Sequence, residues 1–355
     1  MLVRMALAAG LLLLIPERVV AQSYVPQGYQ LTFSEEFADL SIDPLCDGSG
    51  NWLPYWCKYG VRHLADNGDE AIKADPSYRG TGGPTLAEHG LLTHERTPGN
   101  TLKLYGRVIP NAIRSQYYGF PYVGGMISSE RSHAQTHGYW EVRARFTNTS
   151  KGHHWAIWLL PQDGAWPPEI DLVEVVGQQP HRFFMNAHGT GSSQLVWFSP
   201  DDPSGWHTWG FLWTEDDLIW YVDGVARKRI SNYINKPMYL LISPEIGGSW
   251  AGHPDKSTVW PMEAEIDYIR VYELGSADIT APSIPTDLVA EAVSSSQINL
   301  SWSPSTDDVG VTRYDVFRGT ALLGATESNS FSDTLRCFDS LWLWNLRCCD
   351  SPCCG

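Results

Sequence analysis

Three acidic residues lie within six positions of one apolar stretch, Glu169, Asp171 and Glu174, in the sequence WPPEIDLVEVVG. Aspartate and glutamate are depleted in β-strands, so their presence in such a stretch requires a reason. Side chains alternate along a strand, which places Glu169 and Asp171 on one face and Glu174 on the other. A β-bulge at Leu172-Val173 returns Glu174 to the shared face. The spacing therefore predicts a bulged strand with three carboxylates on one side.

A pair of carboxylates on one strand face fits retaining glycoside hydrolysis, in which the two groups lie about 5–5.5 Å apart. We assign Glu169 as the nucleophile and Glu174 as the acid/base. Asp171, between them, is expected to hydrogen-bond the nucleophile. An acid must keep its proton near neutral pH, which a nearby carboxylate and aromatic burial favour.

The alternative is a strand whose carboxylates only face solvent. Bulky and aromatic neighbours around the three acids argue against it. A second Glu-x-Asp pair, Glu265 and Asp267, offers an internal comparison. It lacks a third carboxylate, because Arg270 stands where one is needed. We interpret the second pair as structural.

The elements that position these acids are predicted to be antiparallel strands. Short alternating apolar runs occur at 140–146, 218–222 and 266–272, with turn residues between them. Asp223-Gly224 is typical of a tight hairpin turn. The sequence shows no apolar helical stripe of useful length. These patterns predict an all-β sandwich of two antiparallel sheets.

The ends and the charge of the chain restrict where it acts. Residues 1–21 read as a signal peptide, with Arg4, an apolar stretch at 6–15 and small residues before Gln22. A membrane anchor is disfavoured, because the apolar stretch is too short to span a bilayer. The net charge of -15 argues against nucleic acid and against an acidic membrane surface. We expect a secreted or periplasmic protein.

Composition divides the rest of the chain into four parts. Residues 22–274 form the main domain, and 275–281 read as a linker. Residues 282–334 carry three short alternating strands with Trp302, and resemble the first half of a fibronectin type III module. Residues 335–355 hold five of the seven cysteines and match no closing strand. Our hypothesis for this tail is a shifted reading frame; the alternative is a genuine cysteine-rich appendage. Cys46 and Cys57 either pair or stay free thiols.

Residues 30–273 resemble glycoside hydrolase family 16, the group of laminarinases, agarases and carrageenases. The Glu-x-Asp-x-x-Glu motif is the most specific match, and others follow in chain order, at 33–37, 128–131, 137–145, 155–161, 220–224 and 266–273. The resemblance implies a concanavalin-like jelly roll, an open cleft, endo cleavage and retention of configuration. It also implies the roles assigned above for Glu169, Asp171 and Glu174.

The resemblance implies further site residues. His188 lies where the family places a cleft histidine, and Trp155, Trp158 and Trp166 are expected to stack on sugar rings. Many family members hold a structural calcium, for which the matching residues are Glu36 and Asp267. One departure concerns a subsite wall, where the family usually shows Asn-apolar-Ala before Gly247-Gly248. This chain has Ser-Pro-Glu-Ile at 243–246.

The sequence therefore predicts a monomeric endo-β-glycosidase whose partner is a polysaccharide, most consistent with a β-1,3- or β-1,3-1,4-glucan. The chemistry requires no cofactor. Three alternatives stay open: the same chemistry on a galactan or a bacterial exopolysaccharide, a transglycosylase, and a non-catalytic carbohydrate-binding protein. The intact set of three carboxylates argues against the last.

Overall fold

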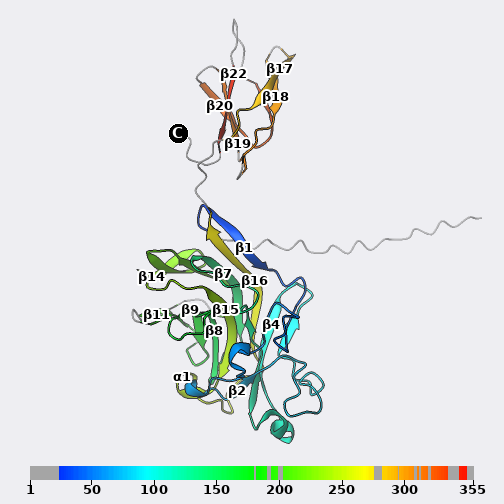
Figure 1. The fold of residues 1–355 in the computed structure, drawn as a ribbon, viewed down its shortest axis with the longest axis vertical. Helices are drawn as coiled ribbons and strands as arrows, with labels where there is room; N and C mark the ends of the chain where they lie inside the picture. Colours follow the sequence, from blue (N-terminus) through cyan, green and yellow to red (C-terminus); the bar gives the residue numbers. More distant parts are fainter. Residues whose placement is uncertain are drawn as a thin grey trace, which may run out of the picture. The chain divides into compact units, whose positions relative to one another are not determined.

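A computed structural model describes residues 24–179, 181–189, 193–198, 203–275, 282–294, 296–307, 310–311, 313–318, 321–334 and 344–349. The chain divides into two compact units, Met1–Leu274 and Gly275–Gly355 (Figure 1). The predicted signal peptide and most of the predicted linker lie outside the described residues. Among the described residues, no helix combines the length and the apolar composition needed to cross a membrane.

The larger sheet of the first unit has ten strands. Its main path is β14-β13-β12-β7-β16-β4-β5-β2, while β1 pairs with β16 and β3 with β4. The strands are β1 Tyr29–Glu35, β2 Ala71–Lys73, β3 His94–Arg96, β4 Leu102–Val108, β5 Tyr122–Gly124, β7 Gly138–Thr147, β12 His207–Trp213, β13 Asp217–Val222, β14 Val225–Ser231 and β16 Met262–Leu274.

The smaller sheet has six strands in the order β11-β10-β9-β8-β15-β6. They are β6 Ile127–Ser128, β8 His153–Pro161, β9 Glu169–Val176, β10 Arg182–His188, β11 Ser193–Phe198 and β15 Met238–Ile246. The strand with the three acids, β9, is an inner strand, paired on both sides by β8 and β10. Its backbone is therefore held along both edges.

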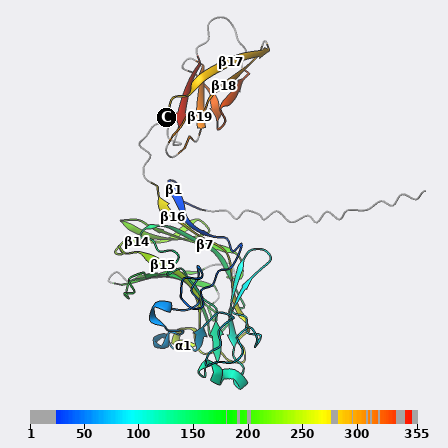
Figure 2. The same ribbon diagram turned by 45° about the vertical axis from the view of Figure 1, so that its right-hand side comes forward.

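The two sheets face each other across one apolar core (Figures 1 and 2). Residues from both contribute, among them Trp140 and Trp209 from the larger sheet and Ile157 and Val173 from the smaller one. The predicted runs fall within β7, β13 and β16. The predicted hairpin is confirmed: β13 and β14 are joined through Asp223 and Gly224, whose φ angles are 51° and 74°. The prediction of an all-β sandwich for this unit is also confirmed.

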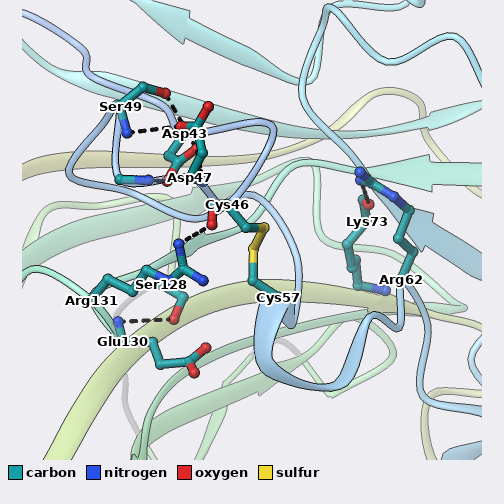
Figure 3. Close-up of a disulfide and its surroundings, with 11 residues drawn as sticks. Asp43, Cys46, Asp47, Ser49, Cys57, Arg62, Lys73, Ser128, Glu130 and Arg131 are labelled. Carbon is teal, nitrogen blue, oxygen red and sulfur yellow. Dashed lines mark hydrogen bonds between the residues drawn. A yellow bond between two sulfur atoms is a disulfide. The ribbon is translucent and has the colours of Figure 1, made fainter.

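Helices are few and short among the described residues. They are the 3-10 turns Cys57–Tyr59, Ala65–Asn67 and Asn111–Tyr117, and the single α-helical turn α1, Gly248–Ala251. A disulfide joins Cys46 to Cys57, which resolves the open question of these two cysteines (Figure 3). Arg131 donates to the carbonyl of Cys46 beside it. The disulfide thus ties the first 3-10 turn to the preceding loop.

The second unit contains two three-stranded sheets, β17-β18-β21 and β20-β19-β22. Their strands are β17 Thr286–Ser294, β18 Gln297–Ser303, β19 Arg313–Arg318, β20 Ala321–Thr326, β21 Ser330–Asp333 and β22 Trp344–Cys349. Trp302 is buried beside Tyr314, as its predicted core position requires. The expectation that the tail supplies no closing strand is wrong for 344–349, which pair with β19. The fibronectin resemblance and the origin of the tail stay predictions.

Candidate active site

A β-bulge on β9 brings the three carboxylates to one face of the smaller sheet. Toward β8, Val173 pairs with Ile157, but Asp171 already pairs with the next residue, Trp158. The register toward β10 also gains one residue between Asp171 and Glu174. The apolar side chains at 170, 172, 173 and 175 all join the core. The predicted bulge is confirmed, and it lets the acids share the face turned away from the core.

The backbone of the bulge is anchored from the opposite sheet. The indole N–H of Trp220, on β13, donates to the carbonyl of Asp171 at 2.8 Å. Trp220 is fully buried, so this bond lies in a dry environment. Hydrogen bonds are stronger there, and an unpaired carbonyl would carry a desolvation cost of about 1–3 kcal/mol. The position of β9 is therefore tied to the packing of the two sheets.

Glu169, the first residue of β9, is partly buried and accepts hydrogen bonds. The indole N–H of Trp166 donates to its Oε2 at 2.9 Å. Nε2 of His188 lies 3.5 Å from its Oε1. Burial and the carboxylate of Asp171 raise the pKa of Glu169 to about 8, although His188 and Trp166 lower it. The two donors thus offset only part of the effect of burial, and both bind the ionised form that a nucleophile needs.

His188 lies between Glu169 and Asp171. Its Nε2 is 3.1 Å from Oδ2 of Asp171, and the nitrogen and oxygen atoms that the three residues offer lie within 4.8 Å of one another. The hydrogen bond to Asp171 is the largest effect on His188 and raises its pKa to about 9. We expected Asp171 to bond Glu169 directly; in the structure His188 contacts both. His188 therefore supplies the positive charge that keeps two close carboxylates together.

Glu174 lies in a different environment, buried among polar side chains. Nε2 of His154, on β8, lies 3.1 Å from its Oε1. The amide of Asn186, on β10, donates to its Oε2. The other ring nitrogen of His154 is 3.4 Å from Oε2 of Glu245 on β15. Glu245 is the acidic residue of the 243–246 stretch that departs from the family pattern.

Sequence reasoning missed His154, Asn186 and Glu245 as site residues. A signal existed for Asn186, since it alternates with His188 along a strand, and the residues on either side of Asn186, Met185 and Ala187, are apolar. Nothing local could reveal that Glu245 meets His154. That contact depends on the pairing of β15 with β8, in which these two residues are opposite each other.

The three tryptophans that were predicted to stack on sugar rings differ in how far they are exposed. Trp155 is wrong for this role, because its side chain is fully buried in the core between the sheets. Trp158 lies opposite Asp171 but is only 7% exposed, and its N–H donates to the hydroxyl of Ser243 at 3.1 Å. Trp166 is 67% exposed and touches Glu169. Its ring is the one among the three that a sugar can reach.

The residues implied for calcium do not fit that ion. Arg270 binds Glu36, with its Nε 2.7 Å from Oε1, and Arg143 binds Asp267 at 2.7 Å. A calcium shell consists of oxygen ligands, and a guanidinium on each carboxylate competes with the cation. Among the described residues, the only group of three or more potential metal ligands is Glu169, Asp171 and His188. We derive no calcium site from Glu36 and Asp267.

The second Glu-x-Asp pair has the structural role expected for it. Glu265 accepts from Arg145 at 2.9 Å and from Thr101 at 2.6 Å, on the larger sheet. Asp267, as described above, is bound by Arg143. The Glu-x-Asp pair of β16 is therefore bound by arginines, whereas the Glu-x-Asp pair of β9 is contacted by His188.

Comparisons with known proteins agree with this geometry. The family model described as Glycosyl hydrolases family 16 matches residues 92–270. The endo-1,3-1,4-beta-glycanases ExsH and EglC of Rhizobium meliloti (strain 1021) are each 35% identical, over 251 and 254 residues. Each alignment covers 68% of this chain, which spans about half of either relative, 51%. The laminarinase catalytic domain from Thermotoga maritima MSB8 superposes with a TM-score of 0.56 at 25% identity, over 70% of this chain and 99% of that domain.

Proposed function

The chain belongs to glycosyl hydrolases family 16, and from that premise we propose that it is a secreted, retaining endo-β-glucanase. Its substrate is a β-1,3- or mixed β-1,3-1,4-linked glucan. The observation that carries the proposal is the shared face of β9. There Glu169 and Glu174 have separate sets of hydrogen-bond donors, as two carboxylates with different roles require.

The reaction proceeds in two displacements. The carboxylate of Glu169 attacks the anomeric carbon while Glu174 gives its proton to the glycosidic oxygen. The bond to the leaving sugar breaks, and a glycosyl ester forms on Glu169. Glu174, now a carboxylate, then takes a proton from water as the water oxygen attacks the same carbon. The ester breaks, Glu169 returns to its carboxylate form, and configuration is retained.

The choice of glucan and the secretion rest on separate supports. The two Rhizobium relatives are named for β-1,3-1,4-glycan cleavage, and the superposed Thermotoga structure is a laminarinase. Secretion is supported by the signal-like residues 1–21 and by the disulfide between Cys46 and Cys57, because disulfides persist in oxidising compartments. We further propose that the partial module after residue 282 is fibronectin-like and takes no part in catalysis.

The test is product release from laminarin, lichenan, agarose, carrageenan and a bacterial exopolysaccharide, by chains 22–355 and 22–274 in parallel. We expect oligosaccharides from laminarin or lichenan, with equal rates from both chains. Products only from agarose, carrageenan or the exopolysaccharide would replace the substrate assignment. Binding without products from any polymer would favour a non-catalytic protein. Slower cleavage by the shorter chain alone would give the second unit a role.

Two substitutions at Trp166 separate its N–H from its ring. Trp166→Phe keeps a flat ring and removes the donor to Glu169, so we expect kcat to fall about 10-fold with little change in KM. Trp166→Ala also removes the exposed ring, and should raise KM in addition. Steady-state kinetics on the glucan that is cleaved gives both constants. Equal KM values for the two variants would exclude sugar stacking by this ring.

A further inference from the structure

The imidazole of His154 has a carboxylate at each ring nitrogen, Glu174 at Nε2 and Glu245 at Nδ1. An ionised carboxylate can only accept a hydrogen bond. If both carboxylates are ionised, both nitrogens must carry hydrogen, which makes the ring an imidazolium. Asn186, the partner of the second oxygen of Glu174, is neutral. The positive charge in contact with Glu174 therefore comes from His154.

The surroundings keep this arrangement in place. The side chain of His154 is 8% exposed, with the ring of Trp250 5.0 Å away, centroid to centroid. Burial lowers the pKa of His154, but the bonds to Glu174 and Glu245 outweigh it and raise the pKa to about 10. Burial alone would raise the pKa of Glu245, yet His154 and Lys73 lower it overall. Asn67 also donates to Glu245, at 3.4 Å.

We propose that His154 and Glu245 form a charge pair that positions the acid/base Glu174 and sets the alkaline limit of catalysis. His154 acts through Glu174 and is a positioning residue. The proposal rests on the proposed function, because it assigns a consequence to the role of Glu174. It also gives a purpose to Glu245, the residue by which the chain departs from the family pattern.

The sign of the effect follows from the charges that face Glu174. A cation in contact with a carboxyl group favours the charged form of that group, and removal of the cation favours the neutral form. Asp171 is an acidic neighbour and interacts with Glu174, and His188 faces it from β10. Glu245 keeps the proton on His154. Without His154, Glu174 would lie near two carboxylates, Asp171 and Glu245, and would lose the cation that contacts it.

The first experiment is the pH profile of kcat/KM for His154→Gln on the glucan that the wild type cleaves. Glutamine can still donate to Glu174 but carries no charge. We expect the alkaline limb to move upward by about 1 pH unit. The matched control is His253→Gln, which removes an exposed histidine whose carboxylate partner is Glu70 and not a residue of β9. The control should leave the limb in place.

An unmoved limb in His154→Gln, with activity lowered equally at every pH, would reduce His154 to a packing role and overturn the proposal. A limb moved to lower pH would also overturn it. Thermal denaturation of both variants shows whether they are folded.

A second measurement is independent of turnover and of the stability of His154→Gln. The chain has 11 histidines, and ¹⁵N labelling of their rings distinguishes imidazolium from neutral imidazole. At pH 8 the wild type should show a buried ring with both nitrogens protonated, and in Glu245→Gln that ring should lose a proton at lower pH. A neutral His154 in the wild type at pH 8 would overturn the charge pair, even if no tested polysaccharide were cleaved. If no polysaccharide is cleaved but the imidazolium is found, only the proposed function fails.

Discussion

Glu169→Gln is expected to lower kcat on the glucan by about 10⁴-fold or more, because the amide cannot form the covalent intermediate. The fold should survive, since Glu169 is the first residue of β9 and only partly buried, and glutamine has the same shape. Its indole partner, Trp166, can still donate to the amide oxygen. Kinetics and a thermal melt, measured on the same preparation, check both expectations.

The control for this variant is Glu265→Gln, which alters the second Glu-x-Asp pair of the chain. It removes the charge that Arg145 and Thr101 bind, so the melting temperature should fall while kcat stays near the wild-type value. Azide adds a chemical test with Glu169→Ala. The anion fits the space left by the carboxylate, and its attack from that side should give a glycosyl azide of inverted configuration. Near-normal activity of Glu169→Gln would remove the nucleophile assignment.

Glu174→Gln should lower kcat on the natural glucan by roughly 10²–10⁴-fold, the usual contribution of general acid–base catalysis. The loss should depend on the leaving group. An aryl glycoside that departs without a proton needs no acid in the first step, so its glycosylation rate should be nearly preserved. The alkaline limb of the pH profile should also disappear. Stopped-flow release of the aryl group, compared with release of glucan products, measures the difference.

The same variant discriminates between the two glutamates. Azide attack in Glu174→Ala takes place on the glycosyl enzyme, so its product should have retained configuration, the opposite of the product from Glu169→Ala. Exchanged configurations in the two variants would reverse the assigned roles. Equal losses on the glucan and on the activated glycoside would show that Glu174 is not the acid.

The sequence predicted the bulged strand β9 well because its information is local. Side chains alternate along a strand, so the number of residues between Asp171 and Glu174 predicts a bulge if all three acids share a face. Both features can be seen in eight consecutive residues. The error at Trp155 was avoidable by the same rule. Trp155 and Trp158 are three apart, so a regular strand turns them to opposite faces, and only one could lie beside the acids.

The partners of Glu174 could not be found in this way. His154 and Glu245 are opposite each other on β8 and β15, and their contact depends on strand order and register, which are set by tertiary packing. The disulfide had the same limitation, because pairing of Cys46 and Cys57 depends on a distance across a loop. The arginine partners of Glu36 and Asp267 likewise became visible only with the sheets assembled.

The bulge of β9 has a consequence for how such an enzyme can diversify. Glu169 and Glu174, the proposed nucleophile and acid, belong to one continuous strand, and the spacing between them is fixed by the backbone and by the indole of Trp220 behind it. Loops that contact the polysaccharide can lengthen, shorten or change composition without moving one glutamate relative to the other. The polysaccharide that is cut can therefore change during evolution while the spacing of the two glutamates stays the same. Under the proposed mechanism, the anomeric configuration of the products then stays the same as well.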